Sequence, residues 1–167
     1  MDKPEWILYQ PDKPEDDLIN TEMTYPDNVI TLVEVCMQAY SQARWIDLSE
    51  FNDRDQSESW VIVDARAEEE ISVSTIPGAI TLEALCADLK AYRNTSILVY
   101  CTIGCRSGNV AESLMADGFR TYNLWGGVIA WALHGNSFIT SGGEETYQVH
   151  VFDEKWNVIP PPYETVW

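Results

Sequence analysis

The stretch ILVYCTIGCRS at residues 97–107 joins a strand pattern to a helix pattern. Its first five residues form a short apolar run rich in β-branched side chains, which is typical of a strand buried on both faces of a parallel sheet. The run WVIVD at residues 60–64 has the same character, and TYNL at 121–124 is a weaker third. Helical patterns occupy residues 82–92 and 107–117. This alternation predicts a three-layer α/β domain, whose central parallel sheet has right-handed crossovers and helices on both faces.

The composition divides the chain into three parts. Residues 1–26 hold four prolines and seven acidic residues against two lysines, which predicts an acidic, proline-containing arm. Whether WILY at 6–9 docks this arm onto the domain or the arm is a solvated tail is left open. Residues 27–137 form the domain. Residues 138–167 alternate in polarity and predict a C-terminal β-rich extension that packs on the domain.

Several local elements follow from periodicity and turn residues. Apolar residues recur at helical spacing from Val29 to Tyr40, and Asp27 is in place to cap that helix. Gly118 suits the left-handed end of the helix over 107–117. The polar residues 49–59 are expected to form a loop. Within the extension, a turn at 153–155 is expected to join a strand at 146–152 to a second at 156–159.

Charge and length exclude several classes of function. The chain has 167 residues and a formal net charge of −17, which disfavours binding to nucleic acid or to anionic membranes. It contains no run of about 18 apolar residues, so no membrane span is expected. The first residues lack the pattern of a secretory signal, so we expect a cytoplasmic protein. The oligomeric state is left open.

The four cysteines are too few for a disulfide-stapled scaffold. Cys36 and Cys86 lie in apolar helical patterns, and we expect both to be small buried hydrophobic residues. Cys101 and Cys105 are different, because they lie four positions apart between a strand and a helix. His134 and His150 are far from them in the sequence, so we expect no metal site and no cofactor.

Cys101 is predicted to be a nucleophile. It ends a central strand, where open α/β sheets place their ligands, and a four-residue loop leads from it to the next helix. Successive loop N–H groups and the helix N-terminus converge on the sulfur, which favours the thiolate. This predicted anion cradle consists of Thr102, Ile103, Gly104, Cys105, Arg106 and Ser107.

Four ordered motifs make the chain resemble a single domain of the rhodanese-like sulfurtransferase family. VIVDAR at 61–66 is similar to the family's strand ending in Asp-x-Arg, with acidic residues after it. IPGA at 76–79 is similar to part of Gly-His-Ile-Pro-Gly-Ala. CTIGCRS at 101–107 matches the active-site loop Cys-x-x-Gly-x-Arg-Ser, and LWGGVIAW at 124–131 resembles Leu-x-Gly-Gly-x-x-x-Trp. The resemblance covers about residues 29–135.

The resemblance implies a thiosulfate:cyanide sulfurtransferase-like enzyme. Cys101 would take a sulfane sulfur from thiosulfate, a persulfide or a polysulfide and pass it, as a persulfide, to a thiophilic acceptor. The implied partners are a small-molecule or protein sulfur donor and a thiol acceptor. Phosphatases and arsenate reductases of the superfamily carry the longer loop Cys-x5-Arg, whereas this chain has Cys-x4-Arg, so they are the less favoured alternative. A non-catalytic binding or regulatory module is the other alternative.

The chain departs from the family pattern at three places, the last of which is Cys105 within the loop. Ser74 and Thr75 replace the family's Gly-His, a change expected to cost little function. Within the loop, Arg106 is the single cation, so on this acidic chain we expect a persulfide or polysulfide donor rather than a dianion. The role of Cys105 is left open between a sulfur relay, a disulfide with Cys101 and a passive side chain, of which the last is favoured.

The remaining motif residues have structural interpretations beside functional ones. Asp64 and Arg66 are expected to anchor the strand end by hydrogen bonds rather than touch substrate. Trp125 is a candidate for the mouth of the pocket. Gly126 either lets the backbone pass close to the active loop or simply forms a strand-to-helix turn. No general base is assigned.

Overall fold

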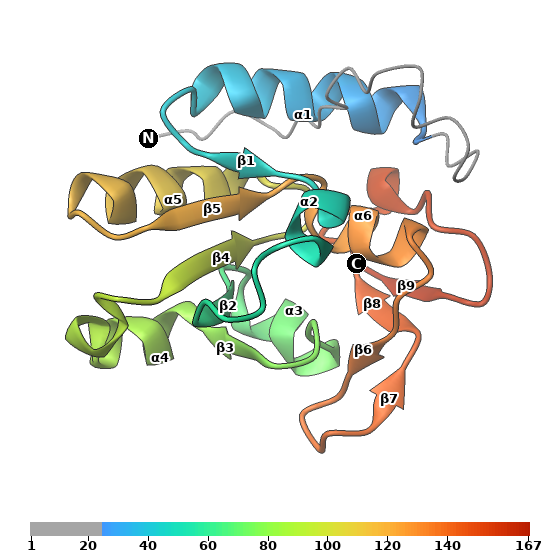
Figure 1. Ribbon diagram of the computed structural model, residues 1–167. Coiled ribbons are helices and arrows are strands. Elements are labelled where there is room, and N and C mark those ends of the chain that lie inside the picture. The colour runs from blue at the N-terminus through green and yellow to red at the C-terminus, as the bar shows by residue number, and fades with distance from the viewer. Residues whose placement is uncertain (1–24) are drawn as a thin grey trace.

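The computed structural model describes residues 25–167, in which a five-stranded parallel sheet of order β1-β5-β4-β2-β3 forms the centre (Figure 1). Helices cover the sheet, so the predicted α/β class is confirmed. Most of the predicted N-terminal arm, up to residue 24, lies outside the described residues. Within residues 25–167, every helix is too short or too polar to cross a bilayer.

The elements follow the sequence patterns closely. The strands are β1 (Trp45–Ile46), β2 (Trp60–Asp64), β3 (Ala79–Thr81), β4 (Ser96–Tyr100) and β5 (Thr121–Leu124). The helices are α1 (Asp27–Ala39), α2 (Leu48–Asn52), α3 (Glu68–Val73), α4 (Leu82–Ala87), α5 (Cys105–Ala116) and α6 (Gly127–Leu133). A 3-10 turn at Leu89–Tyr92 completes the helical pattern predicted over 82–92.

Strand β4 lies at the centre of the fold and is buried along its whole length. Ile97 and Val99 belong to a hydrophobic cluster that includes Leu85 of α4 and Leu114 of α5. Leu98 and Tyr100 belong to a second cluster with residues of α1, α2 and α6. Because neighbouring strand residues point to opposite faces, both faces of the sheet are covered, as the continuous apolar run predicted.

Two local predictions within the domain are corrected by the structure, and two short strands were missed. Residues 48–52 form α2 instead of loop, because Asp47 and Glu50 make a capping box: Glu50 N donates to Asp47 Oδ1 at 2.8 Å, and Asp47 N donates to Glu50 Oε2 at 3.0 Å. The cap of α1 is Pro26, and Asp27 is the first helical residue. Strands β1 and β3, which have two and three residues, were not predicted.

The C-terminal extension holds four short strands and one 3-10 turn. β6 (Phe138–Ile139) pairs antiparallel with β7 (Glu145–Thr146), and β8 (Gln148–His150) pairs parallel with β9 (Glu164–Val166). The predicted hairpin between 146–152 and 156–159 is therefore wrong. The reason is local: the Asp153 carboxylate accepts a bond from Lys155 N, and residues 154–156 turn into a 3-10 helix.

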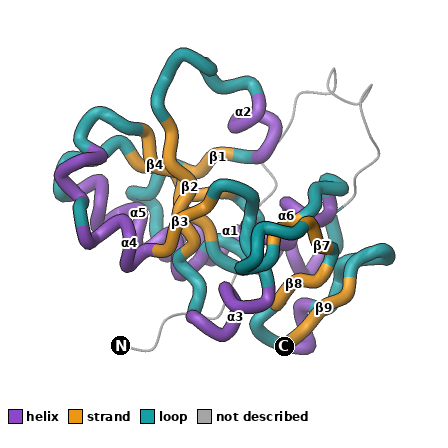
Figure 2. Tube along the Cα trace, turned by 90° about the horizontal axis from the view of Figure 1, so that it is seen from below, coloured by secondary structure: helices purple, strands orange, loops and turns teal. Residues whose placement is uncertain are grey.

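This extension contacts the domain beside α3. Figure 2 shows β8 and β9 next to α3, and the Ser74 hydroxyl at the end of α3 donates to Gln148 O at 2.6 Å. Thr75 forms an antiparallel bridge with Ile139. Both residues that depart from the family's Gly-His thus contact the extension.

Candidate active site

Cys101 directly follows β4, at the carboxyl edge of the sheet. Its thiol is free and fully buried. The Gly104 N–H donates to Cys101 Sγ at 3.1 Å, so the loop turns at least one amide toward the sulfur. Helix α5 begins at Cys105, immediately after Gly104. The sulfur therefore lies inside a tight loop that leads into a helix N-terminus.

The carbonyl groups at the start of the loop are held outward by α6. Val128 N donates to Cys101 O at 3.0 Å, and Ile129 N donates to Thr102 O at 3.2 Å. Gly127 makes this approach possible, because a Cβ on it would lie 2.1 Å from Cys101 O. With these carbonyls bound outside, the peptide groups of the loop can present N–H rather than C=O to the sulfur.

Gly104 and Asn123 hold the other half of the loop. Gly104 has φ +114°, in the left-handed region that favours glycine, and a Cβ there would lie 2.7 Å from the ring of Trp45. Asn123 of β5 donates through Nδ2 to Gly104 O at 2.7 Å. This buried amide fixes the carbonyl of the residue whose N–H contacts Cys101.

The Arg106 side chain pairs with a buried carboxylate, that of Glu70. Its Nη1 and Nη2 donate to the two oxygens of Glu70 at 2.5 and 2.7 Å, and Nη2 also donates to Thr102 Oγ1 at 3.0 Å. Thr102 Oγ1 in turn donates to Glu70 at 3.1 Å. Burial alone would raise the pKa of Glu70, but the hydrogen bonds and charge of Arg106 outweigh it and bring the pKa below its ordinary value. Arg106 therefore braces the loop through α3.

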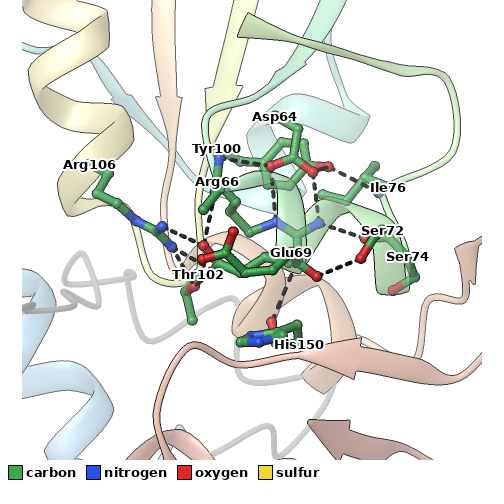
Figure 3. A network of polar contacts seen from close by, with 12 residues as sticks. Asp64, Arg66, Glu69, Ser72, Ser74, Ile76, Tyr100, Thr102, Arg106 and His150 are labelled. Atoms are coloured by element: carbon green, nitrogen blue, oxygen red, sulfur yellow. Dashed lines mark hydrogen bonds and ion pairs between the residues drawn. The ribbon is translucent and has the colours of Figure 1, made fainter. Parts of the chain in front are cut away.

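A second buried network supports the ends of β2 and β4. Arg66 donates through Nε and Nη2 to the Asp64 carboxylate at 2.9 and 2.7 Å, and through Nη2 to Ser74 O at 2.6 Å. Tyr100 donates its hydroxyl to Asp64 at 2.5 Å. In Figure 3, Arg66 lies between Asp64 and the backbone of His150, whose carbonyl accepts from Nη1 at 3.5 Å. Asp64 and Arg66 thus form hydrogen bonds with each other and with neighbouring groups of the protein, as expected of residues that anchor a strand end.

Cys105 faces away from Cys101 and forms a disulfide with Cys36 of α1. Three predictions about the cysteines are therefore corrected. Cys105, favoured as a passive side chain, is a cross-link. Cys36 is buried as expected but is covalently paired, because α1 packs directly on α5 and brings the two sulfurs together. Cys86 is exposed, because α4 turns it away from the sheet. The disulfide considered between Cys101 and Cys105 is absent from the structure, in which Cys101 is free.

The other predicted site residues are all buried. Ile103 is fully enclosed, and Ser107 lies in the first turn of α5 with its hydroxyl buried. Trp125, considered for the pocket mouth, is instead buried edge-on against Tyr25, with ring centroids 4.6 Å apart. Gly126 has φ +71°, and a Cβ there would lie 2.5 Å from Ala130 Cβ, so the turn into α6 requires a glycine.

Sequence reasoning did not single out three residues that shape the site: Glu70, Tyr100 and Asn123. Glu70 lies in the acidic stretch after Asp-x-Arg, but nothing in that stretch distinguishes it from its exposed neighbours Glu68 and Glu69. The available signal was the position of Glu70 three residues after Ala67, which is the spacing of a helix-start contact. Glu70 Oε2 accepts a bond from Ala67 N there.

The two histidines bond elsewhere. His134 Nε2 lies 2.7 Å from the Tyr25 hydroxyl, and His150 Nδ1 accepts from Phe152 N at 3.0 Å. Within residues 25–167, no group of three or more His, Cys, Asp or Glu side chains is arranged to hold a metal ion. A buried free thiol that receives the Gly104 N–H can act chemically as a sulfur nucleophile.

The chain is similar to several known proteins. A sequence profile of the rhodanese-like domain matches residues 47–134. A sulfurtransferase from Allochromatium vinosum is 33% identical over 91 residues, 52% of this chain and 85% of that protein. A putative sulfurtransferase from Bacillus subtilis is 32% identical over 79 residues, 44% of this chain and 75% of the relative.

A solved structure extends the comparison to three dimensions. The thiosulfate sulfurtransferase from Pseudomonas aeruginosa superposes with a TM-score of 0.54 at 27% identity, covering 65% of this chain and 22% of that one. This chain thus corresponds to about a fifth of that larger protein. The profile match includes the whole Cys101 loop and stops before the C-terminal extension.

Proposed function

This chain belongs to the rhodanese-like domain family, and from that premise we propose that it is a sulfurtransferase in which Cys101 carries the transferred sulfur. The observation that carries the proposal is the environment of Cys101. Its thiol is free and receives the Gly104 N–H, while the carbonyls of Cys101 and Thr102 are bound on the outside of the loop. An anionic sulfur is the species that such a cradle stabilises.

The proposed reaction has two displacement steps. The Cys101 thiolate attacks the sulfane sulfur of the donor, the donor's S–S bond breaks, and the remaining sulfite or thiolate leaves with the electron pair. A thiolate or cyanide acceptor then attacks the outer sulfur of the Cys101 persulfide, and Cys101 leaves as the thiolate. Both steps exchange one S–S bond for another bond to sulfur, and neither needs a general base when the thiolate is already formed.

Two rival functions are less well supported. A phosphatase or arsenate reductase would need to enclose a larger tetrahedral oxyanion, and the four residues between Cys101 and Arg106 make a smaller loop than Cys-x5-Arg. A non-catalytic module has no chemical need for a free thiol in an ordered cradle. The retained Cys101, Gly104 and Arg106 therefore favour the enzyme.

The partners follow from this chemistry. We propose a small-molecule or protein sulfur donor and a thiol acceptor, with no nucleic acid or membrane partner on a chain of net charge −17. The proposed location is the cytoplasm. The disulfide between Cys36 and Cys105 is the feature that argues against it, because structural disulfides are uncommon in reducing compartments.

The test is turnover of thiosulfate, and separately of a polysulfide, with cyanide as acceptor. Cys101→Ser is expected to lower sulfur transfer by about a thousandfold or more, because the hydroxyl is a far weaker nucleophile. Cys86→Ser is the matched control, since Cys86 is an exposed free thiol outside the site. Turnover retained by folded Cys101→Ser, or absent from the unchanged protein with every donor, would overturn the proposal.

A further inference from the structure

Strand β5 places two polar side chains, Thr121 and Asn123, in the interior of the protein. Both residues are fully buried, and β5 lies beside β4 and contacts α5 (Figure 1). Asn123 Nδ2 donates to Gly104 O at 2.7 Å. Within residues 25–167, Asn123 Oδ1 and Thr121 Oγ1 are buried without a hydrogen-bond partner. The one side-chain bond of Asn123 in this part of the chain therefore leads to the active-site loop.

An amide that is only half satisfied is unfavourable in a protein interior. A buried oxygen without a partner has lost its hydrogen bonds to water and gained none in return. An apolar side chain of similar size at position 123 would remove that oxygen. The Gly104 carbonyl would still have a partner, because Gly108 N donates to it at 2.9 Å. Stability alone therefore does not account for an asparagine at this position.

The bond from Asn123 holds the residue whose amide contacts the sulfur. Gly104 N donates to Cys101 Sγ at 3.1 Å, and Gly104 O accepts from Asn123. Glycine has more backbone freedom than other residues, and the φ of Gly104 is +114°. Without the bond from Asn123, the peptide groups on either side of Gly104 are freer to rotate, and the N–H can turn away from the sulfur.

The same bond orients the first peptide group of α5. The peptide unit between Gly104 and Cys105 is planar and trans, so its N–H points opposite to its C=O. Gly104 O is directed toward β5 and along α5, where it accepts from Asn123 and Gly108. The Cys105 N–H therefore points out of the N-terminal end of α5, the end at which a helix stabilises negative charge.

We infer that Asn123 is a positioning residue for sulfur transfer, whose amide holds the peptide groups around Gly104 in the orientation that stabilises an anionic sulfur on Cys101. The inference rests on the proposed sulfurtransferase function and deepens it. Asn123 acts through Gly104. Its unpartnered oxygen accompanies the amide nitrogen that holds the loop.

The test compares Asn123→Leu with Thr121→Val, each made in a Cys86→Ser background without added reductant. Both substitutions replace a buried polar side chain of β5 by an apolar one of similar size. Cys101 is the single thiol in this background, because the other two cysteines are linked to each other. The ultraviolet absorbance of the thiolate, followed below the pH at which tyrosine ionises, therefore reports Cys101.

Asn123→Leu is expected to move the midpoint of this titration upward by about one pH unit relative to Cys86→Ser alone, because the anionic sulfur is held less well. Sulfur transfer at pH 7 should slow about tenfold and recover as the pH is raised, since one unit changes the thiolate population by up to tenfold. Thr121→Val should change neither quantity, because Thr121 Oγ1 makes no bond within residues 25–167.

The melting temperature separates a positioning role from a structural one. Asn123→Leu removes an unpartnered oxygen, so its melting temperature is expected to equal or exceed that of the reference protein. Asn123→Ala guards against a leucine that does not fit, since the shorter side chain cannot clash with Gly104. It should show the same shift of the titration.

An unmoved titration in the folded Asn123 variants, or an equal shift in Thr121→Val, would overturn the inference and leave the proposed function intact. An unchanged protein that transfers no sulfur from any donor would overturn the proposed function, and the inference with it. The titration needs no sulfur donor, so the two failures are distinguishable.

Discussion

Cys101 and Cys105 belong to one loop, yet their sulfur atoms have different partners. On the inner side of the loop, Cys101 is a free thiol that receives the Gly104 N–H. On the outer side, Cys105 is bonded to Cys36 and ties α5 to α1. Both cysteines are buried, so burial does not distinguish them. What distinguishes them is the direction of the side chain relative to the loop amides, which separates a sulfur available for exchange from one used as a cross-link.

The largest effect on stability is expected from the loss of the disulfide between Cys36 and Cys105, on the outer side of the loop. Cys36→Ser removes a cross-link between residues 69 positions apart, which in the chain-entropy model lowers the free energy of unfolding by about 4 kcal/mol. Sulfur transfer should stay within about threefold of the unchanged protein, because Cys36 lies outside the cradle. Urea unfolding and the turnover assay, both without added reductant, measure the two quantities, with Cys86→Ser as the control.

Either of two results would contradict this contrast between the two cysteines. An unchanged free energy of unfolding would show that the cross-link has no structural role. A loss of transfer of more than tenfold in folded Cys36→Ser would show that the outer side takes part in the chemistry.

A somewhat smaller loss of stability is expected when Glu70, the carboxylate that braces the loop through Arg106, is substituted. Glu70→Gln leaves Arg106 without its anionic partner, and removing one member of a buried pair costs about 3 kcal/mol. Glu69→Gln, at an exposed neighbour, should change the free energy of unfolding little. Equal losses in the two variants would contradict the assigned role of Glu70.

The pair of Glu70 and Arg106 also predicts how the stability of the protein depends on pH. The pKa of Glu70 is lowered in the folded protein, since the bonds and charge of Arg106 outweigh the opposing effect of burial. Its contribution is therefore fully present above the unfolded value of about 4.3 and is lost as the pH falls through the folded pKa. The stability difference between the unchanged protein and Glu70→Gln should be constant near pH 7 and shrink in acid. A difference that grows in acid would contradict this sign.

The smallest of these effects concerns the packing of α6 against the loop. Gly127→Ala would place a Cβ 2.1 Å from Cys101 O, whereas a Cβ on Gly135 meets nothing within 4 Å. Both glycines have positive φ, so the two alanine variants share the backbone cost. The close contact should make Gly127→Ala less stable than Gly135→Ala by about 2 kcal/mol. Equal melting temperatures would show that the approach of the two backbones is not tight.

Much of the fold could be predicted because its long elements carry clear patterns. The buried run of β4 and the turn signals around it identified a parallel α/β sheet. β1 and β3 were missed because two or three residues are too few to show a period. The helix at residues 48–52 could have been predicted, since Asp47 and Glu50 have the spacing of a capping box within a polar stretch.

The site was predictable where neighbours in sequence are also neighbours in space. The loop from Cys101 to Ser107 is such a segment. The pair of Glu70 and Arg106 is not, and neither is the disulfide of Cys36 with Cys105, because pairing of distant residues depends on how the helices pack. The docking of the extension against Ser74 is likewise encoded by no local pattern.

The most direct test of the account is to find where sulfur is loaded. The protein, free of added thiol, is incubated with a polysulfide, and its intact mass and fragmented peptides are recorded. The account predicts one added sulfur on Cys101, with Cys36 and Cys105 still linked to each other. Sulfur on Cys105 or Cys86, or a disulfide between Cys101 and Cys105 in place of the added sulfur, would contradict it.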